Sequence, residues 1–351
     1  MSRFFASGLS ALKPYVPGEQ PRDQQYIKLN TNESPFPPAP GVIQALDSAQ
    51  VEKPNLYSDP TAAELVNAIA DRYGLPAEQV FVGNGSDEVL AFAFYAYGEH
   101  SVTAPDISYG FYPVFTDFFK QQLKVIPLEE DFTIDPAKFT GADGMVVLAN
   151  PNAQTGLYLE LSEIEKIVAG NPDQVVLVDE AYIDFGGESA AALIERYDNL
   201  LVVQTFSKSR NLAGARVGFA LGNAALIADL NTLRNSFNPY NLNRLSILAG
   251  KAAMEDEEYF LRCTRTVAEN REYTKARLKE MGFGVLDSRG NFVLAEPPAL
   301  SGKEYYLELK KRGVLVRYLG IARIENYVRI TIGTREQMDR LLEITEEILK
   351  G

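Results

Sequence analysis

Four short apolar runs constrain the fold of this chain most strongly, because each is followed at once by polar residues or glycine and then by a helical pattern. The runs span residues 80–82, 146–149, 175–178 and 200–203. Short apolar runs without alternation are typical of strands that are buried on both faces. Because strands alternate with helical patterns as far as residue 222, we predict an α/β fold in which helices sandwich a mostly parallel sheet.

The pattern changes after Pro239, and this change predicts a second, smaller unit. A long, charge-dense helical stretch at residues 252–281 is a candidate connector between the two units. Short strands then alternate with helices, near residues 292–294, 314–316 and 327–332, and Thr334 opens a final helix. We therefore expect a proline-rich arm at residues 1–40 that packs on the small domain and a dimer interface, a large domain at residues 41–245 and a small α+β domain at residues 246–351.

The charge balance and the rare residue types exclude several functional classes. The formal net charge of −13 argues against nucleic acid or an anionic membrane as the partner. A single cysteine, Cys263, and a single histidine, His100, leave no material for a disulfide framework, a Cys/His zinc site or a Ser-His-Asp triad. No apolar run approaches the roughly 18 residues of a membrane span, and the first eight residues lack the apolar core of a signal peptide. We expect a cytoplasmic protein that binds no metal.

Lys208 follows one of the buried runs and lies among side chains that suit a phosphate-bearing cofactor. Thr205 and Ser207 precede it and supply hydroxyl donors, and Arg216 supplies a bidentate cation eight positions later. Open α/β sheets bind their ligands just beyond strand ends, where the amine of Lys208 could act as a nucleophile. Taken alone, the motif fits equally well a loop whose Lys208 and Arg216 face solvent.

Asp179 directly follows the run at residues 175–178 and is the second candidate for a residue that binds the cofactor. A carboxylate at the end of an apolar strand is unfavourable unless it has a cationic partner. One partner that fits is the ring nitrogen of pyridoxal phosphate, which an aspartate keeps protonated so that the ring withdraws electrons. The alternative is a helix-capping aspartate, which becomes less plausible when Asp179 and Lys208 occur in one chain in this order.

With these motifs the chain resembles the fold-type-I pyridoxal-phosphate aminotransferases. The resemblance extends from residues 12–15 to residues 328–334, so it covers nearly the whole length. It implies an enzyme that binds pyridoxal 5′-phosphate, takes an amino group from a small-molecule donor and passes it to a 2-oxo acid, expected to be 2-oxoglutarate. Histidinol phosphate and glutamate are the amine donors that it implies.

The resemblance also assigns roles to individual residues. Lys208, Asp179 and Tyr182 become the catalytic residues. Asp179, Tyr182 and Lys208 also bind the cofactor, together with the phosphate cup and the residues around the ring, namely Gly85, Ser86, Asp87, Tyr109, Asn152, Thr205, Ser207 and Arg216. The substrate side is formed by Tyr15, Asn30, Arg317 and Arg329.

The sequence departs from the family pattern at residues 150–156, where the commonest form is Asn-Asn-Pro-Thr-Gly. The second asparagine of that form, which hydrogen-bonds the 3′-oxygen of the cofactor in relatives, aligns with Ala153, and Gln154 replaces the proline. We expect Asn152 to supply the missing amide, with Tyr182 as the other donor.

Three of these assignments compete with simple structural explanations. Arg317 and Arg329 lie in strand patterns, where the exposed face of an edge strand would equally accommodate a charge, and Tyr57 lies in a turn that favours exposure to solvent. In the family, a tyrosine at this position reaches the cofactor phosphate of the neighbouring subunit. The resemblance therefore implies a homodimer in which Tyr57 of one chain completes the site of the other.

Three other classes share most of these motifs. Aromatic aminotransferases and threonine-phosphate decarboxylases differ from the main prediction in substrate and, for the decarboxylases, in the release of carbon dioxide. Noncatalytic regulators with this fold usually carry a separate DNA-binding domain, and the residues before position 40 are too few to form one.

Overall fold

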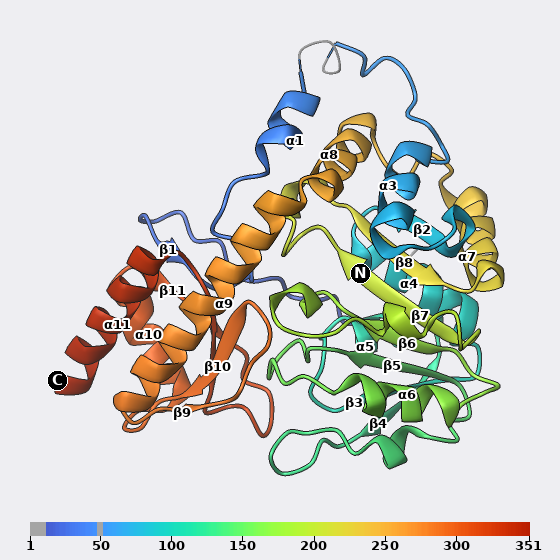
Figure 1. Ribbon diagram of the computed structural model, residues 1–351. Helices are drawn as coiled ribbons and strands as arrows, with labels where there is room; N and C mark the ends of the chain where they lie inside the picture. The colour runs from blue at the N-terminus through green and yellow to red at the C-terminus, as the bar shows by residue number, and fades with distance from the viewer. Residues whose placement is uncertain (1–11, 48–51) are drawn as a thin grey trace, which may run out of the picture.

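The computed structural model describes residues 12–47 and 52–351 and places the four apolar runs in one seven-stranded sheet (Figure 1). Its strands are β2 (Val80–Gly83), β3 (Ser101–Pro105), β4 (Gln122–Ile126), β5 (Met145–Ala149), β6 (Val176–Asp179), β7 (Leu200–Thr205) and β8 (Gly218–Gly222). They are ordered β2-β8-β7-β6-β5-β3-β4, and only β8 runs against the others in this sheet. The mostly parallel sheet predicted from the sequence is confirmed.

Successive residues of the central strands point to opposite sides of the sheet, so each strand contributes to two cores. Helices cover the sheet on both of these faces. Leu148 and Val178 belong to a core that includes residues of three helices, α3 (Ala63–Tyr73), α6 (Leu161–Ala169) and α8 (Arg244–Glu255). Their neighbours Val147 and Leu177 belong to a core on the other face, with α4 (Ser86–Tyr97), α5 (Tyr112–Phe119) and α7 (Ala224–Phe237). Short 3-10 turns connect these elements at Ala77–Gln79, Pro136–Phe139, Ile183–Phe185, Ala190–Leu193 and Ala213–Ala215.

The last third of the chain forms the smaller unit. Its antiparallel sheet contains β9 (Gly284–Val285), β10 (Phe292–Glu296), β12 (Arg317–Tyr318) and β13 (Val328–Thr331), in the order β12-β13-β10-β9. Two helices, α10 (Gly302–Lys311) and α11 (Arg335–Lys350), contribute to its apolar core. Thr334 caps α11 through a capping box with Gln337, so the expected final helix begins where the sequence predicted.

The predicted connector is two helices instead of one. Asp256 lies outside helical geometry between α8 and α9 (Glu257–Glu280), and its side chain accepts a hydrogen bond from the Tyr259 amide, which begins the new helix. Ile247, Ala253 and Met254 of α8 pack in the core of the large unit. The division at residue 245 stays a prediction, and these contacts favour a boundary nearer Asp256.

Among the helices of the described ranges, none is both long and apolar enough to cross a membrane.

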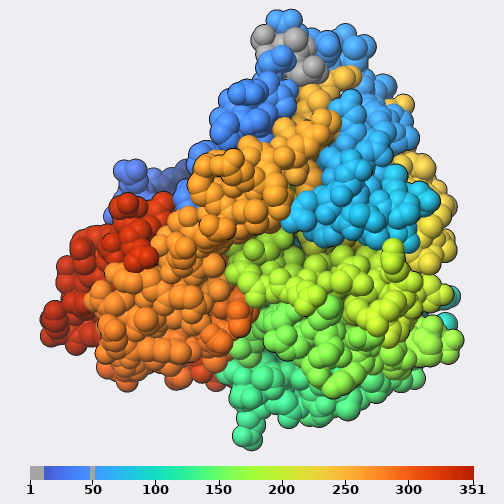
Figure 2. Space-filling view, in the orientation of Figure 1, coloured from blue at the N-terminus to red at the C-terminus, as the bar shows by residue number. Residues whose placement is uncertain are grey.

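The N-terminal arm runs along both units. Its strand β1 (Ile27–Lys28) pairs in parallel with β11 (Val314–Leu315) of the small unit. The helix α1 (Pro40–Ala45) contacts α8, and Figure 2 shows blue N-terminal residues lying directly against the orange chain. The arm therefore joins the small unit near its start and the large unit near its end.

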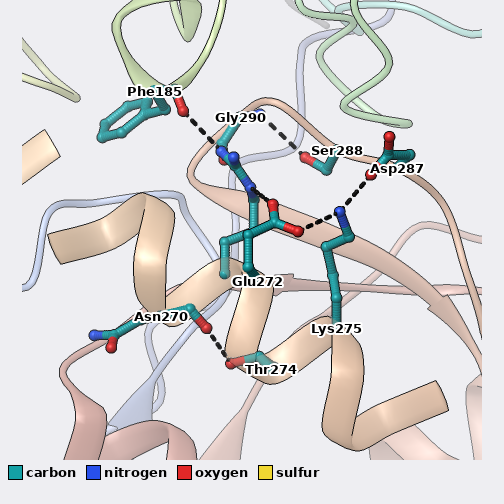
Figure 3. A network of polar contacts seen from close by, with 9 residues as sticks. Phe185, Asn270, Glu272, Thr274, Lys275, Asp287, Ser288 and Gly290 are labelled. Carbon is teal, nitrogen blue, oxygen red and sulfur yellow. Dashed lines mark hydrogen bonds and ion pairs between the residues drawn. The ribbon is translucent and has the colours of Figure 1, made fainter. Parts of the chain in front are cut away.

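A polar network around a buried arginine on α9 links the two units (Figure 3). The guanidinium of Arg271 donates hydrogen bonds of 2.9 Å to the carbonyls of Phe185, in the large unit, and Gly290, which precedes β10. Glu272 accepts from Arg271 and from Lys275, and Lys275 also pairs with Asp287. This network holds the turn that follows Tyr182 against the loop that joins β9 to β10.

Candidate active site

The carboxyl ends of β5, β6 and β7 meet the start of α4 around one cavity. Most of the residues predicted to bind a cofactor line it, although they come from five separate parts of the sequence. The lining residues are Ser86, Asp87, Tyr109, Ala149, Ala153, Asp179, Ala181, Tyr182, Thr205, Ser207, Lys208 and Arg216.

One end of the cavity is built to bind an anion. The first residue of α4 is Ser86, and free backbone N–H groups at a helix N-terminus favour negative charge. Arg216 lies beside them, with Nη2 3.1 Å from Asp87 and Nη1 3.4 Å from the Ser207 hydroxyl. A Cβ at Gly218 would lie 2.3 Å from the Ser86 nitrogen, so this glycine allows β8 to approach the helix start. Amides, hydroxyls and a guanidinium together fit a phosphate group.

Gly85 shapes the same corner. Its φ of 81° lies in the left-handed region, and a Cβ there would come within 2.5 Å of the Arg216 guanidinium. The residue therefore has both a conformational and a steric reason to be glycine. The structure brings Gly85 to the phosphate corner with the residues predicted beside it.

Asp179 is a buried carboxylate with no cationic side chain beside it among the described residues. It is only 4% exposed, and its contacts are the Tyr112 hydroxyl at 2.9 Å and the Ala181 amide at 3.3 Å. Burial raises the pKa of Asp179 to about 6, against the opposing effect of these two donors. At neutral pH the group is mainly ionised and without a cation, so it fits the protonated ring nitrogen of pyridoxal phosphate.

Lys208 extends into the cavity from the loop that follows β7. Its Nζ donates to the Thr31 carbonyl at 3.1 Å and lies 5.8 Å from the centre of the Tyr182 ring. Burial lowers the pKa of Lys208 to about 8, and the charge of Arg329 acts in the same direction. A large share of this amine is therefore uncharged in mildly alkaline solution, as a nucleophile or a base requires.

The prediction for Asn152 needs correction, because its side chain is committed elsewhere. Its Nδ2 donates to the Ile107 carbonyl at 2.8 Å, and its Oδ1 accepts from the amides of Gln154 and Thr155. These contacts hold Asn152 within its own loop, and it borders a neighbouring pocket instead of this cavity. Ala153 reaches the cavity wall but has no polar side chain.

The four residues predicted to bind substrate line a second cavity that adjoins the first. Tyr15, Asn30, Arg317 and Arg329 meet there, with Tyr109, Tyr182 and Lys208 shared between the two cavities. Arg317 and Arg329 are direct partners across β12 and β13, which brings two cations together. Such a pair fits an anionic substrate group better than an exposed strand face.

Contacts within the chain already orient these polar side chains. Arg329 donates to the Ala153 carbonyl at 2.9 Å and to Gln154 Oε1 at 3.0 Å, and its Nε is buried without a partner. Arg317 donates to the carbonyls of Val16 and Pro17. The Oδ1 of Asn30 is also buried without a partner, so the second cavity is lined by two residues that have an unused polar atom.

Tyr57 lies apart from both cavities of its own chain. Its side chain is 78% exposed and stacks on Tyr240, with ring centroids 4.4 Å apart. Arg244 donates to its backbone carbonyl at 3.0 Å. The tyrosine is thus presented outward, where another molecule can meet it.

Two residues at the site were missed by sequence reasoning. Tyr112 contacts Asp179, and Asn32 donates a hydrogen bond to the Tyr182 hydroxyl at 3.0 Å. No local pattern marks Tyr112, which lies 67 residues before its partner. Asn32 lies only two residues after Asn30, which the resemblance assigns to the substrate side.

Comparison with known proteins agrees with this geometry. Residues 24–344 match the family described as aminotransferase class I and II. A histidinol-phosphate aminotransferase of Marinomonas sp. (strain MWYL1) is 52% identical over 347 residues, which cover 97% of this chain and 98% of that protein. One from Brachyspira hyodysenteriae is 48% identical over 354 residues and covers all of both chains.

Solved structures show the same fold. The histidinol-phosphate aminotransferase from Clostridium acetobutylicum superposes with a TM-score of 0.85 at 20% identity, over 92% of this chain and 98% of that one. The Sinorhizobium meliloti histidinol-phosphate aminotransferase in complex with pyridoxal-5′-phosphate has a TM-score of 0.78 at 24% identity, over 93% and 92% of the two chains.

Proposed function

The chain belongs to the aminotransferase class I and II family, and from this premise we propose that it transfers the amino group of histidinol phosphate to 2-oxoglutarate. The products are imidazole acetol phosphate and glutamate, and the reaction is a step of histidine biosynthesis. The observation that carries the proposal is the identity of 48–52% over nearly the full length to proteins of that activity. The cofactor is pyridoxal 5′-phosphate.

The first cavity supplies the groups that would hold this cofactor. The start of α4, the hydroxyls of Thr205 and Ser207, and Arg216 bind its phosphate. Asp179 would bind the ring nitrogen, Tyr182 would donate to the ring oxygen, and Tyr109 would form the wall beside the ring. Bound pyridoxal phosphate supplies the aldehyde carbon that receives the amino group and the ring that withdraws electrons from it.

Lys208 carries the proton transfers. Its amine would hold the cofactor covalently before substrate arrives, and once freed it would act as the base that moves the proton from the substrate Cα. A lowered pKa keeps the amine able to accept that proton. Asp179, which is mainly ionised at neutral pH, would keep the ring nitrogen of the bound cofactor protonated.

The second cavity selects the substrate by its charge. Arg329 and Arg317 bind the phosphate of histidinol phosphate or the carboxylates of the 2-oxo acid and of glutamate. Asn30 and Tyr15 complete the wall beside them. The anion of the substrate would then lie beside the arginine pair, in the cavity that Lys208 also lines.

Initial rates with several amine donors test the proposed substrate. We expect kcat/KM for histidinol phosphate to exceed that for phenylalanine or tyrosine by at least about tenfold, because a phosphate can make one more charged hydrogen bond to the arginine pair. A higher value for an aromatic amino acid would favour an aromatic aminotransferase. Release of carbon dioxide from threonine phosphate would favour the decarboxylase.

Arg329→Lys tests the anion site. The change keeps the charge but loses the bidentate guanidinium, and a charged hydrogen bond contributes about 1.5–3 kcal/mol, so kcat/KM should fall roughly 10- to 150-fold. Arg312→Lys, at the exposed end of α10, is the matched control and should leave kcat/KM unchanged. A decrease below about threefold for Arg329→Lys would remove this residue from the site.

The same proposal includes a homodimer in the cytoplasm whose two sites are shared. Tyr57 is exposed and lines neither cavity of its own chain, which supports a residue that reaches the cofactor phosphate of the partner. The arm contributes little core of its own and would pack across the same interface. A single cysteine suits a reducing compartment.

Mixing two inactive variants tests the shared site. Dimers formed between Tyr57→Ala and Lys208→Ala contain one site with both changes and one with neither, so equal mixing should restore about a quarter of the wild-type activity. The control mixes Lys208→Ala with Asp179→Ala, whose changes lie on the same side of each site and cannot complement. If subunit exchange occurs and the first mixture stays inactive, Tyr57 acts within its own chain.

A further inference from the structure

Asn32 is buried in the arm, between β1 and α1, and every polar group of the residue is engaged. Its side chain is 1% exposed and its φ is 55°, a left-handed conformation that asparagine tolerates better than most residues. Its backbone amide donates to the Thr331 hydroxyl at 3.0 Å, and its backbone carbonyl accepts from Asn291 Nδ2 at 3.0 Å. The residue is therefore anchored to two segments of the small unit.

The side-chain amide of Asn32 is anchored as well. The Thr331 hydroxyl donates to Oδ1 at 2.9 Å, and Nδ2 donates to the Tyr182 hydroxyl at 3.0 Å. In this orientation the amide oxygen faces a donor, the Thr331 hydroxyl, and the amide nitrogen faces an acceptor, the Tyr182 oxygen. Because Thr331 holds the oxygen end, the nitrogen end is presented to Tyr182.

This contact decides in which direction the Tyr182 hydroxyl can act. A phenol has one proton to donate, and its oxygen here already accepts from Asn32. Among the described residues, none accepts the proton of Tyr182, which therefore remains available to the cavity that Tyr182 lines. Tyr109, the other phenol of this wall, donates its proton to Asp87 at 2.8 Å.

We propose that Asn32 is a positioning residue that fixes the Tyr182 hydroxyl as a donor toward the ring oxygen of the cofactor. The inference rests on the placement of the cofactor given above. Burial raises the pKa of Tyr182, and Arg329 and Asn32 oppose that effect, so the phenol keeps its proton at neutral pH. The rings of Phe292 and Tyr182 pack in a T-shaped arrangement, with centroids 5.1 Å apart, which holds the Tyr182 ring while Asn32 directs its oxygen.

Asn32→Asp reverses the direction of this hydrogen bond with almost no change in shape. The carboxylate still accepts from Thr331, and aspartate tolerates the left-handed backbone. Its second oxygen faces Tyr182 as an acceptor, so the phenol proton turns away from the cavity. We expect the dissociation constant of pyridoxal phosphate to rise roughly 3- to 10-fold, and the pH midpoint of the bound cofactor's visible absorbance to shift by up to about one unit.

A double-mutant cycle with Tyr182→Phe separates this role from a structural one. If Asn32 acts through the phenol, Asn32→Asp should change both quantities by less than about twofold, or 0.3 pH unit, when Tyr182 is already phenylalanine. An equal effect in both backgrounds would mean that the new charge or a local distortion is responsible, and no effect in either would show that Asn32 does not direct the hydroxyl. Both outcomes overturn the proposal.

Two further variants keep the test decisive if Asn32→Asp folds poorly. Thr331→Val removes the hydroxyl that holds Oδ1 and should shift the absorbance midpoint in a Tyr182-dependent manner, whereas Thr331→Ser should retain the wild-type midpoint. A Thr331→Val protein that keeps the wild-type midpoint contradicts the proposal. Cofactor binding is measured without substrate, so wild-type protein that binds pyridoxal phosphate but does not use histidinol phosphate would contradict the proposed substrate alone.

Discussion

Lys208→Ala should lower kcat/KM by at least about 10³-fold, the largest effect expected of any single substitution in this chain. The reason is that one amine both holds the cofactor and moves the proton, and a positioned base alone contributes about 10²- to 10⁴-fold. Its amine reaches the cavity from the end of β7, and burial keeps its pKa near 8. Steady-state rates with saturating pyridoxal phosphate provide the measurement.

A chemical label checks the same assignment without relying on rates. Borohydride reduction of the cofactor-loaded protein should leave the label on the peptide that contains Lys208, and Lys208→Ala should carry none. The control is Lys251→Ala, which should behave as wild type, because Lys251 is a partly exposed lysine that pairs with Glu255 on α8. Recovery of the label on a different lysine would refute the assignment.

The cofactor should also attach faster as the pH rises. The Lys208 amine is protonated below its pKa of about 8 and becomes reactive above it. The apparent rate of attachment to the cofactor-free protein should therefore increase between pH 6.5 and pH 9 and level off above. A rate that decreases over this range would mean that another group limits attachment.

Asp179→Asn should produce the second large decrease, roughly 150- to 5,000-fold in kcat/KM. Asparagine keeps the size of the side chain and its contact with Tyr112 but cannot carry the charge that holds the ring nitrogen protonated. Removing one member of a buried charge pair costs about 3–5 kcal/mol, which gives the range above. The absorbance of the bound cofactor should be recorded against pH beside the rates. In Asp179→Asn the absorbance of the form with a protonated ring nitrogen should be lost.

Glu180→Gln is a closely matched control. Glu180 follows Asp179 directly and is also fully buried, with a pKa raised by burial to about 7. Its carboxylate accepts from Ser189, the Ala190 amide and Gln204, and it does not line the cavity. The change should leave kcat/KM within about fivefold of wild type, because no charge that faces the cofactor is lost. An equal loss in both variants would assign the effect to folding.

Much of the fold and the centre of the site follows from local patterns in the sequence. Uninterrupted apolar runs predict β5, β6 and β7, because strands covered on both faces have no room for polar residues. Parallel strands end at one edge of a sheet, so Asp179 and Lys208 were expected to meet there, and the structure brings both to one cavity. These inferences need only the residues within each strand and the rule that parallel strands have their carboxyl ends at the same edge of a sheet.

The remaining features depend on contacts between distant residues. Asn152 looked like the replacement for a missing amide, but its own loop and the Ile107 carbonyl capture the side chain. The break at Asp256 is invisible in a charge-dense helical pattern, and it arises where α8 packs on the large unit.

The hydrogen-bond partners of the catalytic groups show most clearly that contacts between distant residues cannot be predicted from local sequence patterns. Tyr112 meets Asp179 across 67 residues, and Asn32 meets Tyr182 across 150 residues and Thr331 across 299. A local pattern reports which face of a helix or strand a residue occupies, but not which distant side chain lies opposite. The strand-end residues of the site were therefore predictable, whereas the hydrogen bonds that orient them emerge only when the arm, the large unit and the small unit pack together.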